Sequence, residues 1–200
     1  MTKLTSVALL TLALAATTSL FAQPPAGDMP PVPRERVSPH DTISANVGPG
    51  PRGDARKITI SYGRPYSAKG GKGEARKIWG SLVPWDKADR LGSDEATLLI
   101  TPAPMIIGST TIPAGAYTLY IVASENGTTK LAFSSNIAKW GIPVDEKHDV
   151  ARVDLVKSSL EKSVDQLTLT LTREGTTDNY TLGIWWEKTK FSLPFSLKLN

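Results

Sequence analysis

The sequence has no cysteine and only two histidines among its 200 residues. Without cysteine the chain forms no disulfide, offers no thiol nucleophile and has no thiolate to bind a metal. A catalytic histidine needs an oriented partner and a nucleophile within reach. Asp41 follows His40, but adjacent residues of a strand point to opposite faces, and no G-x-S-x-G motif is present. We therefore predict no catalytic residue, no metal site and no cofactor.

Segments apolar enough to enter a membrane are also scarce, and the first residues carry the clearest one. Lys3 precedes an uncharged apolar run from Val7 to Ala16, which is too short to span a bilayer as a helix. A charged start, a short apolar core and small residues before a cut near Ala22 are typical of a signal peptide. We expect residues 1–22 to be cleaved and the protein to be exported to the periplasm or the medium, with no transmembrane segment left.

The rest of the chain divides into a tether and one domain. Residues 23–33 read QPPAGDMPPVP, with five prolines among eleven residues, a composition that forms neither a strand ladder nor a packed helix. We predict a flexible Pro-rich tether over residues 23–35 and a single β domain over residues 36–200.

Apolar residues in this domain recur at every second position, which is typical of strands with one buried face. The pattern is clearest in Gln166–Thr172, Tyr180–Trp186 and Phe191–Leu199. Further strands are predicted at Thr42–Val47, Lys57–Tyr62, Ala96–Thr101, Met105–Ile107, Thr111–Ile112, Tyr117–Ala123, Lys130–Ser134 and Val150–Val156. Long helical crossovers, which a parallel sheet requires, are missing from the pattern. The fold class predicted is all-β, an antiparallel β-sandwich or barrel-like domain of about nine to ten strands.

Three local signals refine this prediction. Asn126-Gly127 predicts a hairpin between its flanking strands. Pro194 cannot donate to a ladder, which indicates an edge strand or a bulge. Ser158–Val164 is the one segment that suggests a helical turn.

The net charge of +4 is distributed unevenly. Residues 34–90 hold 12 Lys/Arg against 6 Asp/Glu, whereas residues 91–200 hold 10 against 12. A basic first half could attract an acidic polymer, a glycan or an envelope protein as partner, but Gly and Pro interrupt the charges, which favours an ordinary solvated surface. No nucleic acid is expected. Gly48–Gly53 matches G-x-G-x-x-G in form, but two prolines interrupt it and a strand follows, so it predicts no dinucleotide site.

Arginines and aromatic residues are interleaved between residues 62 and 95. Planar guanidinium groups beside aromatic rings suit the recognition of carboxylates, phosphates or sugars. The same composition also occurs where buried arginines fix a long loop, and both interpretations stay open. The candidate ligand-binding residues are Tyr62, Arg64, Tyr66, Arg76, Trp79, Trp85, Arg90 and Glu95.

Three function classes are compatible with these residues: a non-catalytic binding or interaction module, a hydrolase that uses carboxylates, and a purely structural subunit. A hydrolase would pair Glu95 with Asp94 or Asp149, and a glycosidase needs two carboxyl groups that face each other. Neighbouring residues of a strand cannot do so. The acidic stretch Asp145–Asp149 lacks the spacing of a calcium loop and is interpreted as solvated.

Several short motifs occur in an order that resembles a known family. They are Arg36-Val37-Ser38-Pro39, Tyr62-Gly63-Arg64-Pro65, Arg76-Lys77-Ile78-Trp79-Gly80, Leu82-Val83-Pro84, Glu95-Ala96-Thr97, Ile112-Pro113-Ala114-Gly115-Ala116-Tyr117, Trp140-Gly141 and Trp186-Glu187-Lys188-Thr189. Over residues 36–195 the chain resembles the exported bacterial family called domain of unknown function 2911. The resemblance implies export and a common fold, and it implies no reaction.

Overall fold

The computed structural model describes residues 36–199, and strands make up nearly all of their regular structure. The eleven strands in this range are β1 (His40–Asn46), β2 (Lys57–Gly63), β3 (Ala88–Arg90), β4 (Thr97–Thr101), β5 (Met105–Ile107), β6 (Thr110–Ile112), β7 (Gly115–Val122), β8 (Lys130–Ser134), β9 (Asp149–Asp154), β10 (Val156–Arg173) and β11 (Asn179–Leu197). Two 3-10 turns, η1 (Lys69–Gly71) and η2 (Glu146–His148), complete the regular elements there. The predicted leader and tether lie outside the described residues.

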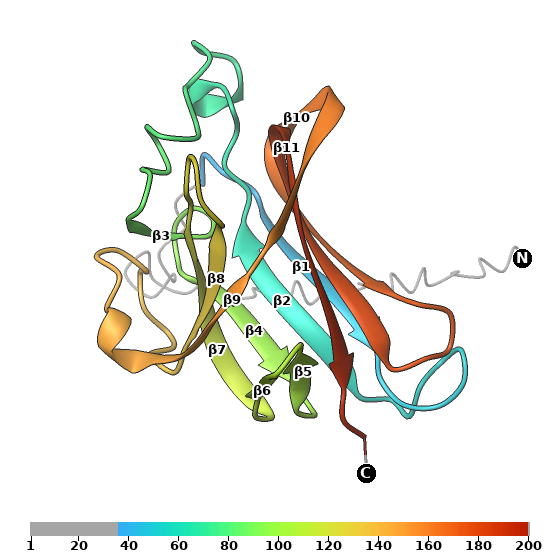
Figure 1. Ribbon diagram of the computed structural model, residues 1–200. Coiled ribbons are helices and arrows are strands. Elements are labelled where there is room, and N and C mark those ends of the chain that lie inside the picture. Colours follow the sequence, from blue (N-terminus) through green and yellow to red (C-terminus); the bar gives the residue numbers. More distant parts are fainter. Residues whose placement is uncertain (1–35, 200) are drawn as a thin grey trace, which may run out of the picture. The chain divides into compact units, whose positions relative to one another are not determined.

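The strands form two antiparallel sheets, which confirms the predicted β-sandwich; neither sheet closes into a barrel. The first sheet has the order β1-β2-β4-β7-β8-β9, and the second has the order β10-β11-β5-β6. In Figure 1 the long β10–β11 hairpin, in orange and red, dominates the second sheet. The Asn126-Gly127 prediction is confirmed, because β7 and β8 on either side of it pair with each other. Within residues 36–199 the structure holds no helix with the length and apolar character that crossing a bilayer requires.

The short strand β3 is not among the predicted strands. Its position sets the place of the loop that connects it to β4. Both β3 and β4 pair with β7, β3 along Tyr120–Val122 and β4 along Gly115–Leu119. They therefore lie one after the other beside the same strand. Residues 91–96 form the connection between them and leave the ladder at this point.

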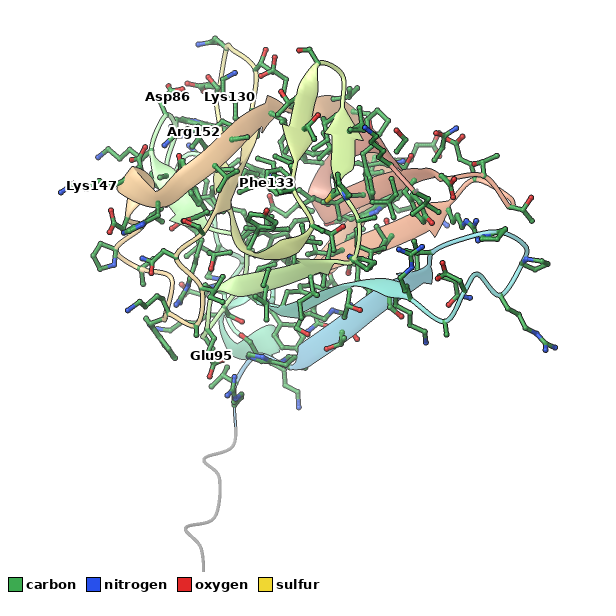
Figure 2. All side chains as sticks on the ribbon, turned by 90° about the horizontal axis from the view of Figure 1, so that it is seen from below. Asp86, Glu95, Lys130, Phe133, Lys147 and Arg152 are labelled. Carbon is green, nitrogen blue, oxygen red and sulfur yellow. The ribbon has the colours of Figure 1, made fainter. Side chains whose placement is uncertain are left out.

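Side chains from both sheets fill a single core. Phe133 of β8, which Figure 2 shows in the interior, is fully buried, as are Leu119 of β7 and Leu167 of β10. Two buried tyrosines also hydrogen-bond from one sheet to the other. The Tyr62 hydroxyl on β2 accepts from the Leu169 amide at 2.9 Å, and the Tyr180 hydroxyl on β11 donates to the Asn46 carbonyl at 2.8 Å.

Strand β11 unites two segments that the alternation predicted as separate strands. Its buried apolar side chains are even-numbered from Tyr180 to Trp186 and odd-numbered from Phe191 to Leu197. The change of parity occurs around Glu187, which has φ = 50° and lies at a register shift between β10 and β11. The left-handed backbone at Glu187 interrupts the alternation of β11, and the following side chains point to the opposite face.

The predicted helical turn at Ser158–Val164 is wrong, because these residues belong to β10. The ladder with β11 is irregular between Ser159 and Thr168, where β10 carries extra residues. Leu160 and Val164 are both partly buried, and this spacing of four imitated a helical period. Pro194 lies between Ser192, which pairs with β10, and Ser196, which pairs with β5. Its missing amide therefore falls in a gap between two ladders.

A candidate binding face

Four loop segments meet at the ends of β1, β2, β3 and β8. They are residues 37–40, 63–66, 89–96 and 137–142, and we call them the loop face. Backbone hydrogen bonds join them: the Arg64 amide donates to the Pro39 carbonyl at 2.8 Å, and the Ala96 amide donates to the Lys139 carbonyl at 3.1 Å. Gly63 allows the closest approach, because a Cβ there would lie 2.2 Å from the Ser93 carbonyl oxygen. The loop face is thus held in place by main-chain contacts.

The first hollow of the loop face has a volume of about 540 Å³. Apolar groups form most of its wall, including Leu98 of β4 and the exposed Ile137 and Trp140. His40 and Glu95 bring polar groups to the same wall. An apolar hollow with a few convergent polar groups is the usual form of a small-molecule site.

A charged cluster adjoins this hollow. Arg36 donates hydrogen bonds to both carboxylate oxygens of Glu95, the longer one at 2.7 Å. His40 Nε2 lies 3.0 Å from Asp94 Oδ2 and 3.7 Å from Glu95 Oε2. The prediction that Asp94 and Glu95 cannot face each other assumed that both lie in a strand, and it is wrong. Neither residue is in a strand, and Asp94 has φ = 61°. Both carboxylates approach the same imidazole.

The charge of Glu95 is fixed by Arg36. The hydrogen bonds from Arg36, helped by the backbone, lower the pKa of Glu95 to about 2. Glu95 is therefore ionised at neutral pH and cannot act as a general acid there. Its side chain is half exposed, so solvent screens the ion pair and its contribution to folding stability is small. Glu95 is available to accept hydrogen bonds from a bound molecule.

The second hollow of the loop face is smaller, at about 290 Å³. Three of the predicted residues line it together: Tyr66, Arg76 and Arg90. Three residues that were not predicted also line it, namely Asp89 of β3, Ser93 of the β3–β4 connection and Trp186 of β11. The two hollows adjoin. Each of the four segments contributes residues to both hollows, different but close in sequence.

Arg90 lines the second hollow and contacts Trp140, a residue of the first hollow. Its Nη1 donates to the Asp94 carbonyl at 2.6 Å and to the Trp140 carbonyl at 3.3 Å. Its guanidinium carbon lies 5.4 Å from the centre of the Trp140 ring, within the range of a cation–π contact. Trp140 itself is 53% exposed. The arrangement presents a cation and a flat aromatic surface side by side.

Burial raises the pKa of Asp89, the acid of the second hollow. Because its folded-state pKa is above its unfolded value, its contribution to stability is fully present below about pH 4 and is lost as the pH rises through the folded-state pKa. We therefore expect Asp89→Asn to melt at a higher temperature than the parent at pH 7 and at the same temperature near pH 3. Thermal unfolding followed by circular dichroism at the two pH values checks this. The exposed Asp165→Asn is the control, and an equal effect of both changes at pH 7 would contradict the role of burial.

The other predicted residues contact the domain's own chain. Arg64 donates to the Leu167 carbonyl at 3.3 Å and to Thr168 Oγ1 at 3.0 Å, and its Nη1 lies 3.6 Å from Asp41 Oδ2. Trp79 packs edge-on against Phe191 and Trp186, with ring centres 5.3 Å and 6.2 Å apart. Trp85 packs on the core, and Tyr62 is buried in it but also lines the first hollow. The predicted set therefore divides between the loop face and the interior.

Other polar clusters lie elsewhere in the domain. Asp149 accepts from the Tyr120 hydroxyl at 2.5 Å and from Arg152 Nε at 2.7 Å. Figure 2 shows Glu95 far from Arg152, on the other side of the domain. Glu95 and Asp149 therefore do not face each other across one cleft. In the part of the chain that the structure describes, no group of three or more His, Asp or Glu side chains is placed to hold a metal ion.

Sequence reasoning missed several residues of the loop face. The alternation places Trp186 on a buried strand face, and the structure confirms its burial. The alternation gives no sign of the hollow that Trp186 also lines. In the sequence Trp140 belongs only to a family motif, and its exposure, which marks a binding surface, is known only from the fold. Arg36 and Ser93 carried no such signal, because neither belongs to a motif with known chemistry.

Comparison with known proteins agrees with the family resemblance that the order of short motifs indicates. The model of a family described as a protein of unknown function (DUF2911) matches residues 38–195. No curated protein and no solved structure matches the chain. The match covers nearly the whole described domain, and the chain belongs to the DUF2911 family.

Proposed function

We propose that the protein is an exported, non-catalytic binding module whose ligand occupies the loop face. The leader-like sequence of residues 1–22 supports export, and the two hollows of the loop face support binding. An acidic polymer, a glycan and an envelope protein are the partner classes that fit a cation beside an aromatic surface.

The position of the exposed apolar side chains carries this proposal. Eight large hydrophobic residues are exposed in residues 36–199, and five of them line the two hollows. These five are Val37, Leu82, Ile137, Trp140 and Ile142. Apolar groups gathered around hollows and bordered by charge are typical of interaction sites, whereas apolar groups scattered singly are not informative.

The hydrolase alternative has less support. Glu95 is held ionised by Arg36, and Asp149 is engaged with Tyr120 and Arg152 on another side of the domain. Within residues 36–199 no serine or threonine hydroxyl hydrogen-bonds to His40, which leaves its imidazole without a nucleophile to activate. The purely structural alternative accounts for Arg64, and it gives no reason for the exposed Trp140.

A ligand screen with a matched pair of variants tests the proposal. The panel contains short peptides, soluble oligosaccharides and vesicles with anionic lipids, and thermal unfolding is measured with each. A ligand at about one hundred times its Kd stabilises the folded state by roughly 2.7 kcal/mol, which raises the Tm of a domain of this size by about 5–10 °C. We expect Trp140→Ala to lose most of this shift, because the exposed ring forms part of the site.

Ile100→Ala is the control, since Ile100 is also an exposed apolar residue, at 47%, and lines neither hollow. It should keep the full shift. If no member of the panel stabilises the parent, or if both variants respond as the parent does, the loop face is not the binding site.

A further inference from the structure

We propose that the second hollow binds a carboxylate carried on an apolar group, with Arg76 and Arg90 as its cationic partners. This inference rests on the proposed function and names the ligand chemistry for one half of the loop face. It is carried by two independent features of the hollow, the charge of its arginines and the unpartnered donors in its wall.

The first feature is a pair of guanidinium groups that form no ion pair. Five arginines in residues 36–199 have a carboxylate partner: Arg36, Arg56, Arg64, Arg152 and Arg173. Of the other three described arginines, Arg52 is exposed, whereas Arg76 and Arg90 are partly buried and both line the second hollow. Arg76 donates only to the Tyr66 carbonyl, and Arg90 only to the carbonyls of Asp94 and Trp140.

Partly buried cations are normally compensated, because removing a charge from water is unfavourable unless an opposite charge or several hydrogen bonds replace the lost solvation. Backbone carbonyls satisfy some of the N–H groups of Arg76 and Arg90, but they bring no negative charge. The two arginines of the described domain that are partly buried and form no ion pair thus share one hollow, in which Asp89 is the one acid. This indicates an anionic ligand.

The second feature is a set of polar atoms without partners. Arg76 Nε, Ser93 Oγ and Trp186 Nε1 are buried and form no hydrogen bond within residues 36–199. All three belong to residues that line the second hollow. Trp186 is the strongest case, because the residue is only 4% exposed and its indole N–H can act only as a donor. Native proteins seldom leave such a group unpaired, and a ligand acceptor that reaches these covered atoms would supply the missing partner.

The shape and net charge of the hollow select the class of anion. Arg76 and Arg90 face one acid, Asp89, so the lining carries at most one negative charge against two positive ones. That balance suits a monoanion better than a phosphate dianion. Val37, Leu82 and Ile142 contribute exposed apolar surface to the same lining and provide a place for an aliphatic group. A carboxylate also has the planar geometry that guanidinium groups bind best.

Two sources could supply such a group, a free aliphatic acid or the C-terminal end of a peptide. The test titrates 4-methylpentanoate and N-acetyl-leucine, as probes of the two sources, into the ¹⁵N-labelled protein and follows the five indole N–H signals. The Trp186 signal is assigned with Trp186→Phe. We expect both acids to move this signal downfield along a saturating curve, because its N–H gains an acceptor, and the acid with the higher affinity identifies the source. The neutral 4-methylpentanamide should leave it in place.

Arg76→Gln should weaken binding of either acid about tenfold or more, because a charge-assisted hydrogen bond is lost. Arg52→Gln removes the same charge from an exposed arginine outside the hollow and should bind as the parent does. If Arg76→Gln does not fold, Arg90→Gln provides the same comparison.

Three results would overturn the inference: a Trp186 signal that neither acid moves, equal responses to the acid and the amide, or tighter binding of inorganic phosphate. The proposed function fails separately. If the acids have no effect but the panel ligands still stabilise the parent and not Trp140→Ala, the loop face remains a binding site and only the carboxylate is wrong.

Discussion

Trp79→Ala is expected to lower the free energy of unfolding by about 3 kcal/mol, the lower end of the range for replacing a packed aromatic residue by alanine. Trp79 is partly buried and packs against the core, with its ring edge-on to Phe191 and Trp186. Its removal leaves a cavity between the connection that follows β2 and strand β11. For a domain of this size the Tm should fall by roughly 6–12 °C, measured by differential scanning calorimetry.

Trp140→Ala is the matched control for this experiment, because both changes remove an indole from the same candidate region. Trp140 is more than half exposed and contacts Arg90 through its ring face. Its loss should lower the free energy of unfolding by less than about 1 kcal/mol. An unchanged Tm for Trp79→Ala, combined with loss of ligand binding, would show instead that Trp79 belongs to the binding site.

Tyr62→Phe has the second largest expected effect, a loss of about 1–3 kcal/mol of folding stability. The Tyr62 side chain is 2% exposed, and its hydroxyl oxygen accepts the Leu169 amide from the opposite sheet. Phenylalanine fills the same space but leaves this buried N–H without a partner. Urea unfolding measures the loss, and faster hydrogen exchange at the Leu169 amide locates it.

Tyr66→Phe is the comparison for Tyr62→Phe. The Tyr66 hydroxyl makes no hydrogen bond to any residue between 36 and 199, so its removal should change stability by less than about 0.5 kcal/mol. Equal stability of Tyr62→Phe and the parent would mean that water or another group can replace the tyrosine hydroxyl, and the hydrogen bond between the sheets would not matter.

The fold followed from the sequence wherever alternation was uninterrupted. Leu167 and Leu169 of β10, and Tyr180 to Trp186 of β11, are buried as their period of two predicted. The prediction failed where the backbone breaks that period. The positive φ at Glu187 accompanies a shift of the buried face from even to odd positions, so one long strand resembled two. Strand β3 has only three residues, two of them charged, and gave no apolar signal.

The candidate site could be predicted only in part, because composition does not say which way a side chain faces. The arginine and aromatic content of residues 62–95 did locate Tyr66, Arg76 and Arg90, which line one hollow. The same composition could not distinguish these hollow-lining residues from Arg64 and Trp79, which contact β10 and β11. The remaining wall comes from residues distant in sequence, such as Trp140 and Trp186, and only the folded chain brings these together.

The central claim, that the loop face is where a ligand binds, is tested most directly by mapping backbone amide signals. The ¹⁵N-labelled protein is titrated with the panel ligand that stabilises it most, and the shifted signals are placed on the structure. We predict shifts concentrated in residues 37–40, 63–66, 89–96 and 137–142, with β5 and β6 unaffected. Shifts confined to the β10–β11 hairpin or to the cluster around Tyr120 and Arg152 would contradict it.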